Sequence, residues 1–210
     1  MRRYAVEFIG TFFLVLTIGC TGLAAAPGVI APLAIGSVLM AMVYAGGHIS
    51  GAHYNPAVTL GVFLRGRCRA LDVLPYWGAQ LLAAVCAAWI VGFALRGKQV
   101  SPLLAPVVGV FLAEFLFTFA LVYVVLNAAT ADATNGNTYF GLAIGFTVLA
   151  GAFAVGQVSG AAFNPAVALG ASIRGLLLWS NFWLYVGAEL LGGAVAALAF
   201  KALNPRPGTA

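Results

Sequence analysis

A short segment occurs twice in this chain, at residues 48–61 and again at residues 157–170. Each copy consists of Ser-Gly, three further residues, Asn-Pro-Ala-Val, one residue and Leu-Gly. Asparagine is a favoured helix N-cap, and proline is favoured at the first helical position, where its missing N–H costs nothing. The glycine before them lets the chain turn sharply. Each copy therefore predicts a loop that leads into a short helix, at about 56–64 and 165–173.

The composition indicates that these loops belong to a membrane protein. Of the 210 residues, 63% are hydrophobic and only 7% are charged, whereas a soluble domain carries about 25% charged residues. We expect an all-α membrane protein that forms a single transmembrane domain over residues 1–210. Six apolar runs are long enough to cross a bilayer, which takes roughly 20 residues: 4–25, 30–48, 72–95, 105–128, 138–157 and 179–203.

The two predicted short helices follow the second and the fifth spans, and they are too short to cross the bilayer themselves. A segment at membrane depth must be buried in protein or line a wet cavity, because lipid cannot satisfy its backbone polar groups. We therefore expect two re-entrant half-helices between the spans.

The repeat extends beyond these segments, with an offset of about 108 residues throughout. The other matching stretches are 5–12 with 112–119 and 76–82 with 185–191. The chain is thus expected to be a duplication, with repeat 1 at about 1–98 and repeat 2 at about 105–205. Because each repeat holds three spans, the second is inverted relative to the first. Such repeats place the functional site at their interface, near the middle of the membrane.

The basic residues predict the orientation, since Lys and Arg are concentrated in cytoplasmic loops. With both termini cytoplasmic, seven basic residues lie inside: Arg2, Arg3, Arg65, Arg67, Arg69, Lys201 and Arg206. Three then lie outside: Arg96, Lys98 and Arg174. The half-helices enter from opposite sides, so that Asn55 and Asn164 meet in mid-membrane. The net charge of +5 therefore reflects topology and does not indicate a nucleic-acid partner.

Other chemistries find little support in the sequence. The three cysteines, Cys20, Cys68 and Cys86, have no metal-binding spacing, and we expect neither a metal nor a cofactor. The sequence holds no nucleophile–base pair or phosphate-binding loop, so we do not expect an enzyme. Glu7 lies inside the first apolar run and five further spans follow, which argues against a cleaved signal peptide.

Two half-helices that meet at their N-termini would exclude charge from the middle of the membrane. Each N-terminus carries about half a positive charge, which repels a cation and a proton moving along a file of water. The side-chain amides of Asn55 and Asn164 add hydrogen-bond donors directed into the gap. Such an arrangement favours neutral, hydrogen-bonding solutes.

These features together resemble the aquaporin and aquaglyceroporin (major intrinsic protein) family over essentially the whole chain. They are the doubled Asn-Pro-Ala segment, the paired Glu-Phe-x-x-Thr-Phe motifs and the six spans in inverted halves. The resemblance implies one pore in each subunit of a homotetramer in the lipid bilayer. Its pore asparagine motifs would be Asn55, Pro56, Ala57, Asn164, Pro165 and Ala166.

Two acidic residues lie inside predicted spans, where an ionisable group is expensive and is usually paired or functional. The resemblance implies that Glu7 and Glu114 each bind backbone N–H groups of a re-entrant loop. A proton relay is the alternative, although the half-helix dipoles oppose it. Gln80 and Glu189 occupy matching positions in the third and sixth spans, where we expect a structural role.

The sequence departs from the family at the expected outer constriction. Most members have an arginine after the second Asn-Pro-Ala, whereas this chain has Val167. Counting back from the two asparagines places Ile35 and Ala152 on the second and fifth spans and Ala161 in the second loop. The predicted constriction therefore consists of small or apolar side chains without charge.

An uncharged, wider constriction suggests a channel for neutral solutes larger than water, such as glycerol, urea, ammonia or hydrogen peroxide. An apolar ring can instead lose its water and close the pore. His48 is expected at the cytoplasmic pore mouth, as a loop anchor, a polar wall residue or a pH-sensitive group. His53 is matched by Ala162, so the repeat geometry does not require it.

Two further function classes stay open at this stage. One is an ion-coupled secondary transporter of a small neutral solute, since broken helices and inverted repeats also occur there. The other is a structural membrane protein with a closed pore. For location we expect a multi-pass protein of the plasma membrane, specifically a prokaryotic inner membrane.

Overall fold

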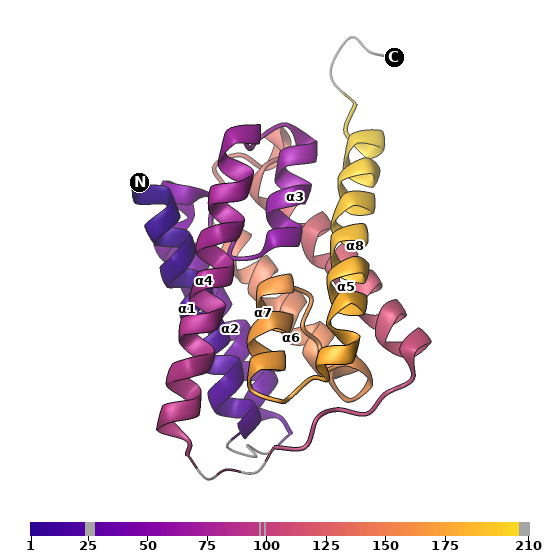
Figure 1. The fold of residues 1–210 in the computed structure, drawn as a ribbon. Helices are drawn as coiled ribbons and strands as arrows, with labels where there is room; N and C mark the ends of the chain where they lie inside the picture. The colour runs from indigo at the N-terminus through magenta and orange to yellow at the C-terminus, as the bar shows by residue number, and fades with distance from the viewer. Residues whose placement is uncertain (24–27, 97, 99, 206–210) are drawn as a thin grey trace.

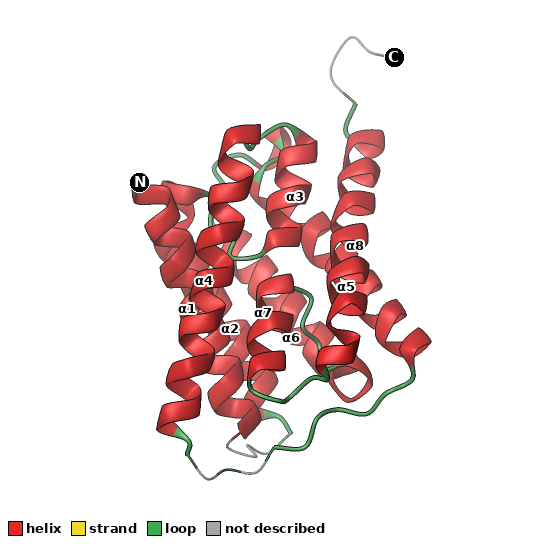
Figure 2. Ribbon diagram, viewed as in Figure 1, coloured by secondary structure: helices red, strands yellow, loops and turns green. Residues whose placement is uncertain are grey.

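The helices confirm the predicted all-α membrane architecture. A computed structural model describes residues 1–23, 28–96, 98 and 100–205, and no strand occurs among them (Figure 2). Six helices are long and apolar enough to cross a membrane: α1 (Arg2–Leu23), α2 (Ile30–Ser50), α4 (Ala70–Ala94), α5 (Val107–Ala129), α6 (Phe140–Ser159) and α8 (Phe182–Leu203). The shorter elements are α3 (Pro56–Arg65), α7 (Pro165–Ile173) and the 3₁₀ turns η1 (Asp132–Thr134) and η2 (Trp179–Asn181).

The two half-helices begin where the Asn-Pro pairs predict. Asn55 is an extended N-cap whose Oδ1 accepts hydrogen bonds from the backbone N–H groups of Ala57 and Val58. Asn164 caps α7 in the same way, through the N–H of Ala166. Both prolines occupy the first helical position. Helix α3 ends one residue later than predicted, at a glycine, Gly66, in the left-handed conformation.

The half-helices interlock the two halves of the chain. Helix α1 packs against α4, and α5 packs against α8 in the equivalent way. Helix α3, however, packs mainly against α8 of the second half, while α7 packs mainly against α4 of the first. Figure 1 shows α3 and α7 one above the other between α4 and α8. Neither half therefore encloses its own half-helix.

Most of the basic side chains lie at one end of the bundle, which we call the terminal face. There Arg3 and Arg69 both pair with Asp72, at 2.9 and 3.7 Å, and Arg65 lies over the ring of Phe200, close to Lys201. At the other end, which we call the opposite face, Arg174 packs beside Gly92 near the end of α4. Arg206, expected on the cytoplasmic side, lies outside the described residues.

Helices α5 and α8 approach closely because α8 carries a glycine at the crossing. A Cβ atom at Gly192 would lie 3.0 Å from the backbone nitrogen of Phe119 and against the carbonyl oxygen of Phe115. In a membrane, small residues let helix backbones come together without a hydrophobic driving force. Since neither backbone atom can move away alone, the helix pair depends on this glycine.

Substitution of Gly192 by valine should lower the free energy of unfolding by about 3 kcal/mol, because α5 and α8 must move apart. Gly187→Val on the same helix is the matched control, since nothing lies within 4 Å of its Cβ position. Thermal unfolding of the two purified variants in detergent tests this. Equal losses of stability in both variants would contradict the crossing described here.

Candidate functional site

The first re-entrant loop is held by one buried carboxylate. Glu7 on α1 is fully buried, and its Oε1 accepts hydrogen bonds from Ser50 Oγ at 2.7 Å and from the backbone N–H of His53 at 2.9 Å. Its Oε2 accepts from the N–H of Tyr54 at 2.6 Å and from Gln80 Nε2 at 2.8 Å. Four donors therefore converge on one side chain, which offsets the cost of burying it.

The second loop has an equivalent anchor. Glu114 on α5 is also fully buried, and it accepts hydrogen bonds from the N–H groups of Ala162 at 3.0 Å and Phe163 at 2.6 Å. Glu189 on α8 accepts from the N–H of Asn164 at 3.0 Å. The two motif glutamates thus each bind the loop of their own half.

Two tyrosines also anchor the loops, and the sequence analysis assigned them no role. Tyr76 donates a hydrogen bond to the carbonyl oxygen of Ser50 at 2.7 Å, and Tyr185 donates to that of Ser159 at 2.6 Å. Both carbonyls lie at helix C-termini, where backbone acceptors have no intrahelical partner. The signal was present, because the stretches that begin at these tyrosines repeat in the two halves.

Each loop contains two non-glycine residues in the left-handed backbone conformation. They are Ala52 and Tyr54, both with φ 51°, and Ala161 and Phe163, with φ 53° and 49°. Such conformations cost free energy and persist only where the surroundings hold them. Here the carboxylate anchors hold the N–H groups of Tyr54 and Phe163, while their carbonyl groups bind the other half of the chain.

The two asparagines connect the half-helices across the middle of the protein. Asn55 Nδ2 donates to the carbonyl oxygen of Phe163 at 2.8 Å, and Asn164 Nδ2 donates to that of Tyr54 at 2.9 Å. An amide nitrogen carries two hydrogens. The opposite loop therefore uses one hydrogen of each amide and leaves the other for the pore.

A series of three cavities runs along the two asparagines. A cavity of about 560 Å³ opens at the terminal face, and another of about 570 Å³ opens at the opposite face. Between them lies a narrow part of about 20 Å³, which Asn55 and Asn164 line. It shares His53 with the first cavity and Val167 with the other. A volume near 15 Å³ holds one water molecule, so the narrow part has room for about one water molecule at a time.

The wall of the narrow part is mostly apolar. Leu14, Ile35, Leu39, Val58, Leu121, Val125, Ile144, Val148 and Val167 are among the residues that form it. The polar side chains of His53, Asn55 and Asn164 line the narrow part too, and they come from the first loop and the half-helix N-termini.

The four residues of the predicted constriction all line the cavity at the opposite face. Ile35 lies on α2 and Ala152 on α6, while Ala161 and Val167 come from the second loop and α7. Ile35, Ala161 and Val167 also border the narrow part. The structure thus gathers all four residues at one cavity, and their side chains present no charge to it.

The two histidines lie at the terminal-face end of the pore. His48 is exposed and lines the cavity there. His53 is buried, borders the narrow part and shares a hydrogen bond of 3.1 Å with Thr59 Oγ1. The repeat comparison gave no sign of this second position, since Ala162 stands at its equivalent.

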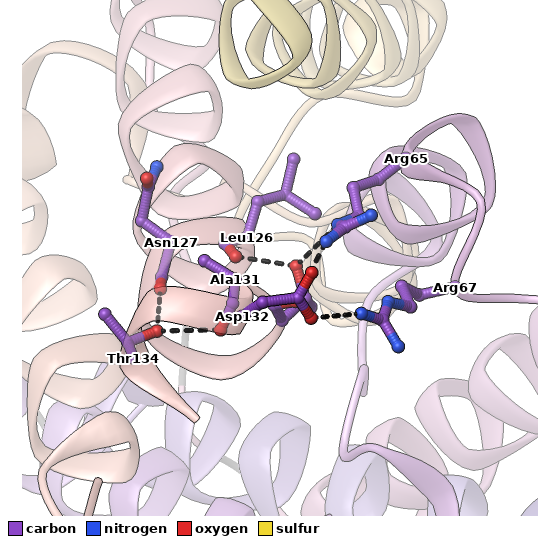
Figure 3. Close-up of polar contacts among 8 residues, drawn as sticks. Arg65, Arg67, Leu126, Asn127, Ala131, Asp132 and Thr134 are labelled. Carbon is purple, nitrogen blue, oxygen red and sulfur yellow. Dashed lines mark hydrogen bonds and ion pairs between the residues drawn. The ribbon is translucent and has the colours of Figure 1, made fainter. Parts of the chain in front are cut away.

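A network of polar contacts closes one side of the terminal-face cavity (Figure 3). Arg65 donates to Thr130 Oγ1 at 3.1 Å and to the Thr130 carbonyl oxygen at 3.0 Å. Arg67 forms an ion pair of 2.5 Å with Asp132 on η1. These contacts join the end of α3 to the loop that follows α5, although the Arg67–Asp132 pair is solvent-exposed and adds little stability.

Comparison with known proteins identifies the family of this chain. The family model described as "Major intrinsic protein" matches residues 1–200. The chain belongs to the major intrinsic protein family. It is a multi-pass membrane protein that acts as a passive channel for water or small neutral solutes, and it is not an enzyme.

Plant members of the major intrinsic protein family are close in sequence. Aquaporin TIP1-1 of Arabidopsis thaliana is 43% identical over 169 residues, 78% of this chain and 66% of that protein. Aquaporin NIP1-4 of Oryza sativa subsp. japonica is 35% identical over 216 residues, 97% of this chain and 77% of that protein. These relatives lend no support to the expectation of a prokaryotic inner membrane.

The fold also matches a solved structure of the family. The aquaglyceroporin from Plasmodium falciparum superposes with a TM-score of 0.79, covering 95% of this chain and 94% of that one, at 22% sequence identity. At this identity the likeness concerns the fold.

Among the described residues, no group of three or more His, Cys, Asp or Glu side chains could hold a metal ion.

Replacing Glu7 by glutamine should weaken the first loop of this major intrinsic protein. The substitution replaces one carboxylate oxygen by an amide NH₂ group, which then faces other donors. A buried polar group left without a partner lowers the free energy of unfolding by about 2 kcal/mol. Asp132→Asn makes the same chemical change at a site whose side chain is 86% exposed, and should leave stability unchanged. Thermal unfolding in detergent compares them, and a Glu7→Gln variant as stable as the unmodified protein would contradict the anchoring role.

Proposed function

We propose that the channel conducts neutral solutes larger than water, with glycerol, urea, ammonia and hydrogen peroxide as candidates. The observation that carries this proposal is the lining of the cavity at the opposite face. At the position where most family members have an arginine, Val167 borders both this cavity and the narrow part. Small apolar neighbours leave room for a solute carbon skeleton, and no fixed cation or arginine donor restricts passage there.

Exclusion of ions and protons would then depend on the middle of the pore. The N-termini of α3 and α7 meet there, each with about half a positive charge, in a part of the pore whose wall is mostly apolar. The free amide hydrogens of Asn55 and Asn164 can donate to a passing oxygen. A water molecule held in this way cannot donate along the file to its neighbour, which opposes proton transfer.

The ion-coupled transporter is less well supported. Coupling ions require acidic ligands or clustered carbonyls near the substrate, and no acidic side chain lines the narrow part within the described chain. Glu7 and Glu114 use their oxygens on loop N–H groups, which likewise argues against a proton relay. An apolar lining can also lose its water and close the pore. Flux measurements distinguish this closed-pore alternative from an open channel.

Orientation and assembly form a further part of the proposal. The terminal face would be cytoplasmic, since it gathers basic residues as cytoplasmic loops do. The family resemblance supports a homotetramer in the plasma membrane, with the single channel domain of two repeats in each subunit. Apolar side chains such as Trp89, Phe93, Leu116 and Trp183 cover the outside of the bundle, where lipid or neighbouring subunits would contact them.

The proposal is tested by stopped-flow light scattering on proteoliposomes, with a sucrose gradient and then a glycerol gradient. We expect fast shrinkage in sucrose, followed in glycerol by rapid re-swelling that does not saturate. Shrinkage without glycerol entry would contradict the proposed solute class. No response above that of empty liposomes would support a closed pore, and saturation with dependence on an ion gradient would support a transporter.

Substitution of Val167 by arginine should restore a charged, narrower constriction. We expect glycerol and urea permeability to fall by about tenfold, which corresponds to ~1.4 kcal/mol of added barrier, while water permeability falls less. Val167→Leu is the control, since it adds volume without charge or donors. Unchanged glycerol and urea flux in Val167→Arg vesicles would show that this position does not set selectivity.

A further inference from the structure

The two halves of the channel differ chemically at one deeply buried position. In the first half the third span contributes Gln80, whose amide nitrogen donates to the loop anchor Glu7 at 2.8 Å. In the second half the sixth span contributes Glu189 beside the loop anchor Glu114. Both members of each pair are fully buried. An amide–carboxylate pair in one half thus corresponds to a pair of carboxyl groups in the other.

Within the described chain, the helices around the second pair carry no basic residue near the level of the two carboxyl groups. The basic residues on the helices that pack around it are Arg65, Arg174 and Lys201, all at or just beyond the C-terminal end of their helices. Lys201 is twelve residues from Glu189, about 18 Å along α8. The other titratable group facing the pair is Tyr185, which donates to the carbonyl oxygen of Ser159. Two adjacent buried carboxylates without a cation cannot both be ionised.

The hydrogen bonds show which carboxyl oxygen of the pair receives no donor. Glu114 receives the N–H groups of Ala162 and Phe163, one on each oxygen. Glu189 Oε1 receives the N–H of Asn164, while its Oε2 is buried and receives no donor from the described residues. Because these three N–H groups belong to consecutive residues, the two carboxyl groups lie next to each other. An O–H on Glu189 would bind Glu114, as the Gln80 amide binds Glu7.

We infer that Glu189 is held as a neutral carboxylic acid that donates its proton to the Glu114 carboxylate, forming a proton-sharing pair beside the pore. Glu189 is then a positioning residue for Asn164. Its carbonyl oxygen accepts the N–H of Asn164, and its hydroxyl group fixes the carboxylate that holds the two preceding N–H groups. The pair is the chemical equivalent of Gln80 and Glu7, with an O–H in place of an amide N–H. This inference does not depend on which solute the pore passes.

Infrared spectroscopy of the reconstituted protein tests the inference directly. The sequence contains only five acidic side chains, so the C=O stretch of a protonated carboxyl group can be assigned by single substitutions. We expect one such band at neutral pH in the unmodified protein, shifted in D₂O and absent in Glu189→Gln. A spectrum without this band at neutral pH, or a band that survives in Glu189→Gln, would overturn the inference.

Substitutions in the two halves separate proton sharing from a merely structural role. Glu189→Gln should keep flux close to that of the unmodified protein, since the amide can both donate to Glu114 and accept from Asn164. Glu189→Leu should lose flux, because it can do neither. Gln80→Glu should add a second protonated-carboxyl band, from a new pair with Glu7. A Glu189→Gln variant with the low flux of Glu189→Leu, or a Gln80→Glu variant that folds without a second band, would contradict the equivalence.

Discussion

The structure depends on two hydrogen bonds that cross the middle of the protein, from Asn55 to the Phe163 carbonyl and from Asn164 to the Tyr54 carbonyl. Each asparagine side chain caps its own half-helix with its oxygen and binds the opposite loop with its nitrogen. The caps start two half-helices at mid-bundle, and the cross-bonds fix their N-termini against each other. The positive ends of both helix dipoles therefore face the narrow part of the pore.

The backbone conformation of the loops and the carboxylates that bind them hold these carbonyl and amide groups in place. The carbonyls of Tyr54 and Phe163 reach across because both residues adopt a left-handed backbone conformation. Carboxylates from α1 and α5 bind the N–H groups of the same residues. The two halves achieve this with related but unequal chemistry, which is most evident at Gln80 and Glu189. The solute-facing wall differs too, since His53 in the first half has no polar equivalent in the second.

Much of this architecture is predictable from the sequence because its signals are local or repeated. The Asn-Pro pair predicts a helix start from the local sequence alone. The inversion of the second repeat follows from the odd number of spans in each repeat. The four predicted constriction residues were chosen through the family resemblance, by counting from the asparagines, and all four line the cavity at the opposite face. Residue-level contacts between the halves were not predictable, since they depend on how the loops fold. The use of one amide hydrogen by the opposite carbonyl and the contact between Arg67 and Asp132 belong to this class.

In the proposed mechanism, the paired half-helix N-termini admit neutral molecules and repel charge, without an arginine at the predicted constriction. The most direct measurement records neutral-solute flux and proton flux in the same proteoliposomes, using light scattering and a trapped pH-sensitive dye. We expect water and glycerol fluxes well above those of empty liposomes, and a proton flux equal to that of empty liposomes. A proton flux that rises with the amount of protein, in step with the neutral flux, would contradict it.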